Sequence, residues 1–170
     1  IRFNNRFGPT FTVPEPLIPK VGAKITALTE PTKKMSKSSE DADSYIGLLD
    51  PPDVVAGKIA RAVTDSGREV RYAPREKPGV SNLLTIYALC RGVPVKKAEE
   101  AFAGSGYADF KKAVAEAVIE TLRPIQARYR ELRASGELRG ILAAGRRRAE
   151  ELAAPTLRLV KERMGLVTAL

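Results

Sequence analysis

The sequence contains no histidine, and this absence excludes several kinds of active site at once. Ser-His-Asp and Cys-His catalysis, histidine general bases and histidine metal sites all need that side chain. The single cysteine, Cys90, excludes an internal disulfide and any multi-cysteine zinc or iron–sulfur site. Its place on the apolar side of an expected helix predicts a buried small hydrophobe. The phosphate-loop pattern GxxxxGK[ST] does not occur either.

Long apolar runs and a signal-peptide pattern are also missing, so we expect neither a membrane-spanning helix nor a secretory leader. What is present is typical of a globular protein: 44% of the 170 residues are hydrophobic and 29% are charged. The length suits about one domain, or a small domain with part of another. The chain opens at Ile1 without Met, so we expect a piece of a longer polypeptide.

The formal net charge of +9 is concentrated in two places. Residues 20–37 carry five lysines against one glutamate, and residues 121–164 carry 11 basic against 5 acidic side chains. Basic excess of this kind suits the phosphates of a nucleotide or of a nucleic-acid backbone. Arginine-rich helices are equally typical of solvated protein surface, so charge alone leaves both readings open.

The first part of the sequence is typical of extended segments and loops. Residues 8–20 contain four prolines, a density that forbids helix and favours an extended crossing segment. Residues 23–28 alternate apolar and polar side chains and predict a short strand. A polar loop over residues 29–39 follows, in which Met35 is the one large apolar side chain.

From residue 50 onward the apolar spacing predicts helices. We expect Asp50 to cap the first helix, with Pro51 at its first position and a buried face repeating every four residues at Val55, Ile59 and Val63.

Further helices are expected over residues 81–91, 94–103, 107–134 and 137–164. Ser81 should open the second helix, and Gly92 should end it. In the last helix the side chains expected on the buried side are Leu138, Leu142 and Leu152. These patterns predict a mainly α protein, in which a strand-and-loop fragment up to about residue 50 joins an antiparallel helical bundle.

Two other patterns have ordinary structural explanations. Asp65, Glu69 and Glu76 lie in a loop among arginines, which favours surface ion pairs over paired catalytic carboxylates. The GxG pattern of Gly104 and Gly106 has no strand before it and no third glycine, so it indicates a turn between helices.

The string Lys34-Met35-Ser36-Lys37-Ser38 combines residues that suit a polyphosphate. Two lysines three residues apart in a small-residue loop can both reach phosphate oxygens, and hydroxyls and backbone N–H groups can add hydrogen bonds. Met35 can supply an apolar contact to a base. By composition alone the same string could be a lysine-serine linker.

KMSKS is the second signature of class I aminoacyl-tRNA synthetases. The neighbouring strings are Pro19-Lys-Val-Gly-Ala-Lys-Ile25, Pro31-Thr-Lys-Lys-Met-Ser-Lys-Ser38, Ala62-Val-Thr-Asp-Ser66, Lys77-Pro-Gly-Val-Ser-Asn-Leu-Leu84 and Glu120-Thr-Leu-Arg-Pro-Ile-Gln126. Together they resemble the C-terminal half of the bacterial tryptophanyl-tRNA synthetases, from about residue 1 to the end. The sister family of bacterial tyrosyl enzymes usually has a different loop string and an additional RNA-binding tail.

The resemblance implies a set of nucleotide contacts. It assigns ATP binding to Ile25, Lys34, Met35, Ser36, Lys37 and Ser38. Lys34 and Lys37 would be catalytic, because they would hold the ATP phosphates and stabilise the pyrophosphate leaving group; Met35 and Ile25 would lie near the adenine. Mg²⁺ would accompany the ATP, with no protein-bound metal site in this chain. After the signature this sequence continues Ser39-Glu40-Asp41, where the family commonly has Asp-Pro-Asn.

The resemblance also implies a domain plan and partners. Residues 1–50 would be the C-terminal remnant of a Rossmann-type catalytic domain carrying the loop, and residues 51–170 a helical anticodon-binding domain. The parent would be a cytoplasmic homodimer, unattached to membranes, that activates tryptophan with ATP and transfers it to tRNA-Trp. The chain lacks the first, HIGH-like signature and the tryptophan pocket, so we expect it to be inactive by itself.

The arginines of the last helix are the candidate tRNA contacts. Arg146, Arg147 and Arg148 cannot all point into a core on a helix that turns about 100° per residue, so at least two should face solvent. Ordinary solubilising surface is the alternative for these arginines. The rival function for the whole chain is a free-standing helical RNA-binding or interaction module whose lysine loop touches only phosphate.

Overall fold

The computed structural model describes residues 1–19 and 21–166, which belong to two compact units. One unit comprises residues 18–129, and the other comprises residues 1–17 with residues 130–170. The units are defined by packing, whereas the division expected at residue 50 is one of function and stays a prediction. No helix in residues 1–19 or 21–166 is long and apolar enough to cross a membrane.

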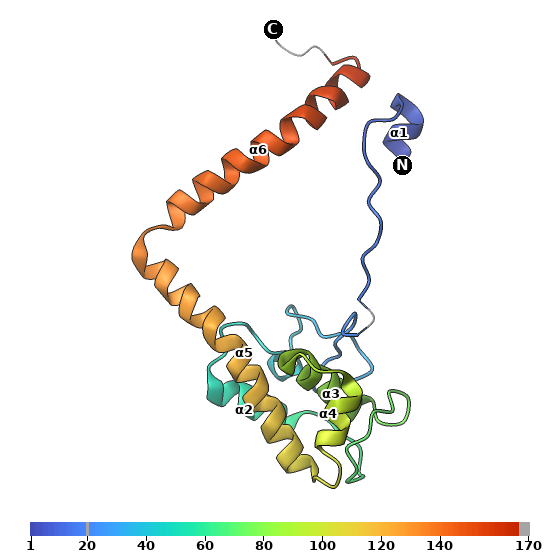
Figure 1. The fold of residues 1–170 in the computed structure, drawn as a ribbon, viewed down its shortest axis with the longest axis vertical. Helices are drawn as coiled ribbons and strands as arrows, with labels where there is room; N and C mark the ends of the chain where they lie inside the picture. The colour runs from blue at the N-terminus through green and yellow to red at the C-terminus, as the bar shows by residue number, and fades with distance from the viewer. Residues whose placement is uncertain (20, 167–170) are drawn as a thin grey trace. The chain divides into compact units, whose positions relative to one another are not determined.

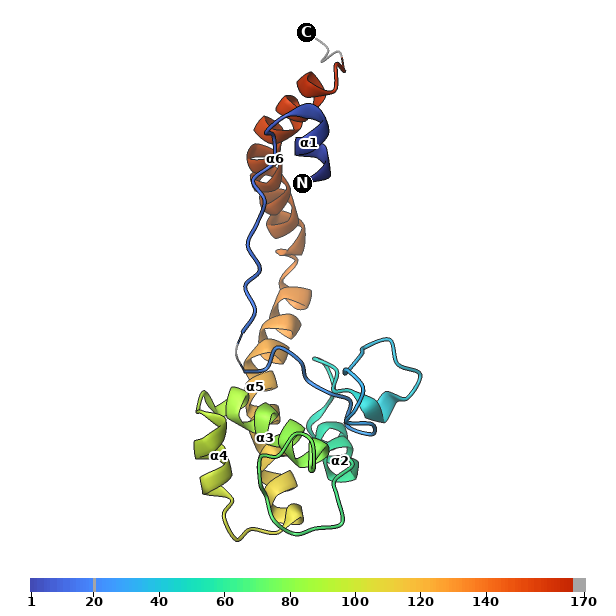
Figure 2. The same ribbon diagram turned by 90° about the vertical axis from the view of Figure 1, so that its right-hand side faces the viewer.

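The larger unit is helical (Figures 1 and 2). Its helices are the 3₁₀ helix η1 (Ala42–Ser44), α2 (Pro52–Arg61), α3 (Pro78–Arg91), α4 (Val95–Ala101) and the first part of α5 (Tyr107–Ser135). Its largest fully buried side chains are Leu28, Val55, Ile59, Val80, Leu83, Leu84, Phe110 and Val114. The ring of Phe102 lies edge-on between Tyr87 and Phe110 and ties α3 and α5 together.

Helices α2 and α5 run antiparallel, as the sequence predicted. Lys111, near the start of α5, donates to the carbonyls of Ala60 and Ala62 at the end of α2. Further along α5, Gln126 donates to the carbonyls of Leu48 and Asp50 just before α2 begins. Opposite ends of the two helices therefore meet.

The predicted start of α2 was one residue early. Pro51 is the N-cap and Pro52 occupies the first turn, while the carboxylate of Asp50 accepts hydrogen bonds from Gly47 and Lys58. The expected burial of Val63 was also wrong, because α2 ends at Arg61 and Val63 lies beyond it, 46% exposed.

Helix α3 begins at Pro78 rather than at Ser81. Proline suits the first turn because its missing N–H has no helical acceptor there. Ser81 is buried inside the helix, where its hydroxyl accepts a hydrogen bond from the N–H of Ala73. The helix ends at Gly92, whose φ of 64° is left-handed, as predicted. Cys90 is half-buried against the core.

The predicted strand over residues 23–28 is reduced to one isolated antiparallel bridge, between Thr26 and Lys34. The segment's backbone groups bond to several different partners: residues 33–35, the carbonyl of Ser44 and the side chain of Asn82. Because no single neighbour continues alongside it, no ladder forms within the described residues.

The smaller unit contains α1 (Arg2–Phe7) and α6 (Leu138–Arg163), with an extended segment following α1. The exclusion of helix expected from the prolines is confirmed over residues 8–19; Lys20 lies outside the described residues. The ring of Phe3 packs against the rings of Phe7 and Phe11. A guanidinium N–H of Arg163 donates to the carbonyl of Phe7 at 3.4 Å.

The expected burial of the α6 leucines was wrong. Leu138, Leu142 and Leu152 are 46%, 64% and 62% exposed, and α6 buries none of its residues. A helical repeat fixes which side chains share a face, but burial also needs an element packed against that face. The described residues of this unit place no such element there.

Candidate phosphate-binding site

The KMSKS string lies in a loop whose two ends are bound to each other. The hydroxyl of Thr29 donates to the carboxylate of Asp41 at 2.5 Å, which joins the start of the loop to its end. Asp41 also accepts the N–H of Asp43 and caps η1. Asp41 is the third residue of the Ser39-Glu40-Asp41 string, where this sequence differs from the usual Asp-Pro-Asn, and it closes the neck of the loop.

The first limb of the loop is fixed by main-chain hydrogen bonds on both sides of Lys34. The N–H of Ala27 donates to the carbonyl of Lys33, and the N–H of Met35 donates to the carbonyl of Ile25, both at 2.9 Å. The backbone at Lys34 is thus held, while its side chain is exposed and can reach a ligand.

The tip of the loop is held by serine hydroxyls. The hydroxyl oxygens of Ser36 and Ser38 are 3.0 Å apart, and the N–H of Ser38 lies 3.4 Å from the Ser36 hydroxyl. Lys37, between them, is exposed and lies in a turn. Both lysines of the signature therefore present their ammonium groups to solvent.

A cavity of about 280 Å³ opens beside this loop. Its lining residues are Ala27, Thr29, Glu30, Lys33, Lys34, Ser36, Ser38, Ser39, Asp41 and Ser44. Glu30 is paired with Lys33 at 2.8 Å, and Asp41 is engaged at the loop neck. A lysine with neighbouring serine hydroxyls suits anionic oxygens.

The structure brings some of the predicted ATP contacts together and leaves others apart. Lys34, Ser36 and Ser38 line the cavity, whereas Lys37 does not. Met35 is half-buried and packs against the hydrophobic core, so it anchors the loop to the larger unit. Ile25 is half-buried and contributes its carbonyl to the loop's backbone.

The described residues contain no group of three or more acidic, cysteine or histidine side chains that could hold a metal ion. Mg²⁺ is commonly bound through substrate phosphates and water, with few protein ligands.

Sequence reasoning missed the residue that supports the loop from behind. Asn82, on α3, is buried, and its side-chain amide bonds to both the N–H and the carbonyl of Thr26 at 2.9 Å. It belongs to the string Lys77–Leu84 that carried the family resemblance. Nothing in the composition of that string distinguishes it from an ordinary helix position.

The base of the loop carries an ion pair with α2. Arg61 donates two hydrogen bonds to Asp43, at 2.8 and 3.0 Å. These bonds lower the pKa of Asp43, against a smaller opposing effect of burial, so the carboxylate stays ionised. The pair joins η1 to the end of α2.

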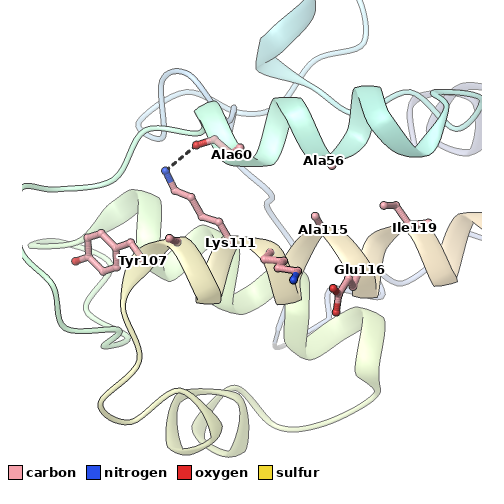
Figure 3. Close-up of a pocket in the computed structure, with 9 residues that line it drawn as sticks. Ala56, Ala60, Tyr107, Lys111, Ala115, Glu116 and Ile119 are labelled. Carbon is pink, nitrogen blue, oxygen red and sulfur yellow. Dashed lines mark hydrogen bonds between the residues drawn. The ribbon is translucent and has the colours of Figure 1, made fainter.

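A second, larger cavity is a groove of about 600 Å³ between α2 and α5 (Figure 3). Small and apolar side chains such as Ala56, Ala115 and Ile119 form much of its lining. Lys111 reaches across it to the carbonyl of Ala60, and burial lowers the pKa of Lys111. Lys112 and Glu116 also line the groove, so its lysines are Lys111, which is already bonded, and Lys112, which lies near a carboxylate-bearing residue of the same helix. With its mostly small and apolar lining, the groove suits a polyphosphate less well than the cavity beside the lysine loop.

The three carboxylates among arginines are in ion pairs, as predicted. Glu69 and Glu76 both pair with Arg71. Asp65 pairs instead with Lys77 at 2.9 Å and accepts a hydrogen bond from the hydroxyl of Tyr107. Burial alone would raise the pKa of Asp65, but these partners and the N–H of Gly67 lower it.

The arginine triplet of α6 faces solvent, which confirms the expectation that at least two of its members would. Arg146 pairs with Glu150 and Arg148 with Glu151, each at 3.5 Å. These are exposed pairs within one helix, which contribute little to stability. Contact between these arginines and tRNA stays a prediction.

The family model described as tRNA synthetases class I (W and Y) matches residues 1–123. The tryptophan–tRNA ligase of Oceanobacillus iheyensis is 53% identical over 165 residues, which is 97% of this chain and 50% of that protein. The ligase of Mycobacterium leprae is 48% identical over 167 residues, 98% of this chain and 49% of that protein. The chain spans about half the length of the curated relatives it matches.

Solved structures agree. The match to tryptophanyl-tRNA synthetase from Mycoplasma pneumoniae covers 98% of this chain and 50% of the Mycoplasma chain, with a TM-score of 0.87 and 35% sequence identity. The enzyme from Campylobacter jejuni, complexed with ADP and tryptophan, matches 97% of this chain and 50% of its own with a TM-score of 0.63 and 26% identity. This chain, with its KMSKS loop, therefore belongs to the class I tRNA synthetases of the tryptophan and tyrosine family.

Proposed function

We propose that this chain forms the half of a tryptophan–tRNA ligase that carries the phosphate-binding loop and the anticodon-binding helices. The observation that carries the proposal is the 53% identity to a tryptophan–tRNA ligase over 97% of the chain. The placement of Lys34, Ser36 and Ser38 around a polar cavity supports it. The free-standing RNA-binding module is the weaker alternative, because it does not account for the identity to a tryptophan–tRNA ligase over 97% of the chain.

In the proposed reaction a carboxylate oxygen of tryptophan attacks the α-phosphorus of ATP, and pyrophosphate leaves with its Mg²⁺. A ribose hydroxyl of tRNA-Trp then attacks the carbonyl carbon of the adenylate, and AMP leaves. Lys34 and Lys37 would offset the negative charge that develops on the leaving pyrophosphate. Ser36 and Ser38 would donate hydrogen bonds to phosphate oxygens, and Ile25 and Met35 would lie toward the adenine.

The domain plan is part of the proposal. Residues 1–50 would complete the nucleotide site of a Rossmann-type catalytic domain, and residues 51–170 would contact the anticodon arm. The parent would act as a homodimer in the cytoplasm, with ATP, tryptophan and tRNA-Trp as its partners. The tryptophan pocket would come from the half of the ligase that this chain does not span, so this chain alone should form no adenylate.

Single lysine substitutions in the full-length parent test the proposal. Lys34→Ala or Lys37→Ala should slow ATP–pyrophosphate exchange by roughly a hundredfold, since one lost charge contact in a transition state costs about 3 kcal/mol. The KM for tryptophan should stay unchanged, because these ammonium groups act on phosphate. Exchange measured against both substrates separates the two effects.

Lys97→Ala is the matched control. Lys97 is an exposed lysine on α4 and does not line the cavity beside the loop. The variant should exchange pyrophosphate nearly as fast as the wild type. A Lys37→Ala enzyme with a wild-type exchange rate would contradict the assignment of pyrophosphate stabilisation to the loop of residues 34–38.

A further inference from the structure

The side chain of Asn82 hydrogen-bonds to both backbone groups of Thr26. Asn82 accepts a hydrogen bond from the N–H of Thr26 and donates one to its carbonyl, each at 2.9 Å, although the two residues are 56 positions apart. We propose that Asn82 is a positioning residue for the phosphate-binding loop, acting through the backbone of Thr26. The inference rests on the function proposed above, because it names a further residue that this function needs.

The route from Asn82 to the lysines is short. Thr26 lies between Ile25, whose carbonyl accepts the N–H of Met35, and Ala27, whose N–H donates to the carbonyl of Lys33. Those two bonds hold the backbone on both sides of Lys34. Asn82 fixes Thr26, which lies between the two residues that make those bonds. It therefore helps to set the position of the Lys34 backbone relative to the cavity.

An amide side chain is suited to this task because it donates and accepts at once. It pairs with Thr26 as the backbone of a neighbouring strand would, which the segment otherwise lacks on this edge. Asn82 is only 8% exposed, so the lost bonds would not be replaced freely by bulk water.

Helix α3, which carries Asn82, packs tightly into the core. Leu83 and Leu84 next to it are 1% and 0% exposed. Gly79, one turn earlier, approaches the backbone of Val63 so closely that an added Cβ would lie 2.0 Å from its carbonyl oxygen. Val63 in turn donates its N–H to the carbonyl of Leu28. The loop is therefore held at residues 26 and 28 by rigid neighbours.

Asn82→Asp is the most informative variant, because it keeps the shape and removes one donor. An ionised Asp accepts from the N–H of Thr26 but repels its carbonyl, whereas a protonated Asp can make both bonds. In the full-length parent near pH 8, we expect ATP–pyrophosphate exchange to fall roughly tenfold with an unchanged KM for tryptophan. The rate relative to wild type should recover as the pH is lowered toward about 5.5.

The controls separate positioning from general damage. Asn82→Ala should show the same defect without recovery at low pH, and Asn5→Asp, an exposed position, should behave as wild type. The titratable side chains that line the small cavity at Asn82 are Lys24 and Tyr72. The wild type carries both, so its own pH series is the reference.

Hydrogen exchange on this chain gives a readout that does not depend on catalysis. In Asn82→Ala the amides of Ala27 and Met35 should exchange faster, while those of Val114 and Val118 in α5 should keep their protection. Uniform acceleration, unchanged loop amides, or an Asn82→Asp enzyme with wild-type exchange would each overturn the inference. If instead Lys34→Ala and Lys37→Ala retain activity, the proposed function fails, whatever the loop amides show.

Discussion

Lys58 carries a nearly buried ammonium group that is hydrogen-bonded to polar partners. Its side chain is 8% exposed, and its Nζ donates to Asp50 at 2.7 Å and to the carbonyl of Tyr45 at 3.0 Å. Burial would raise the pKa of Asp50, but the hydrogen bonds from Lys58 and from the N–H of Gly47 prevail and lower it. The pair therefore stays ionised and fastens α2 to the chain before it.

Asp50→Ala should destabilise the chain by about 3 kcal/mol at neutral pH, because it leaves the Lys58 ammonium buried without its counter-ion. Since folding lowers the pKa of Asp50, its contribution is present above about pH 4 and is lost as the pH falls through the folded value. Urea denaturation at neutral and acid pH should therefore show a smaller difference from wild type in acid. The double variant Asp50→Ala/Lys58→Met should recover much of the loss. A single variant as stable as wild type at neutral pH would contradict this role.

At the scale of elements, helix α3 depends on a glycine at its first turn. A Cβ on Gly79 would lie 2.0 Å from the carbonyl oxygen of Val63, which is backbone and cannot swing aside. Gly79→Ala should therefore push α3 away from residues 63–64 and cost about 3 kcal/mol of unfolding free energy. In contrast Gly140→Ala in α6, where no atom lies within 4 Å, should stabilise its helix by up to about 1 kcal/mol. Thermal unfolding of the two variants would be compared; similar effects would refute the close approach.

The helices show what local sequence can and cannot predict. The bounds of α5 and the glycine stop of α3 follow from spacing and backbone conformation, which are local properties. The exposure of Leu142 could not be predicted, because it depends on whether another element packs against α6. The Asn82–Thr26 contact spans 56 positions and leaves no periodic signal. The lysine loop was found through its string, whereas its neck at Asp41 was not.

At the scale of the whole molecule, the positive charge is the property that attracts a polyanion. Residues 121–164 carry 11 basic and 5 acidic side chains, a net charge of +6, whereas the whole chain has a net charge of +9. The side chains of Arg146 and Arg148 are 76% and 70% exposed, and their 3.5 Å pairs with Glu150 and Glu151 are weak enough to exchange for phosphates. We propose that these arginines and Arg147 contact the tRNA backbone.

If so, this chain should bind tRNA-Trp with an affinity that falls steeply as salt rises, because each neutralised phosphate releases condensed counterion. The variant Arg147→Glu/Arg148→Glu should bind more weakly and should reduce the slope of log affinity against log salt by about 2. Lys96→Glu/Lys97→Glu on α4 changes the net charge equally at another exposed place and is the matched control. Titrations at several salt concentrations would compare the three proteins. Equal losses in both variants would mean that binding follows net charge alone, and an unchanged arginine variant would make the triplet ordinary solubilising surface. A loss confined to the arginine variant would locate the backbone contact on α6.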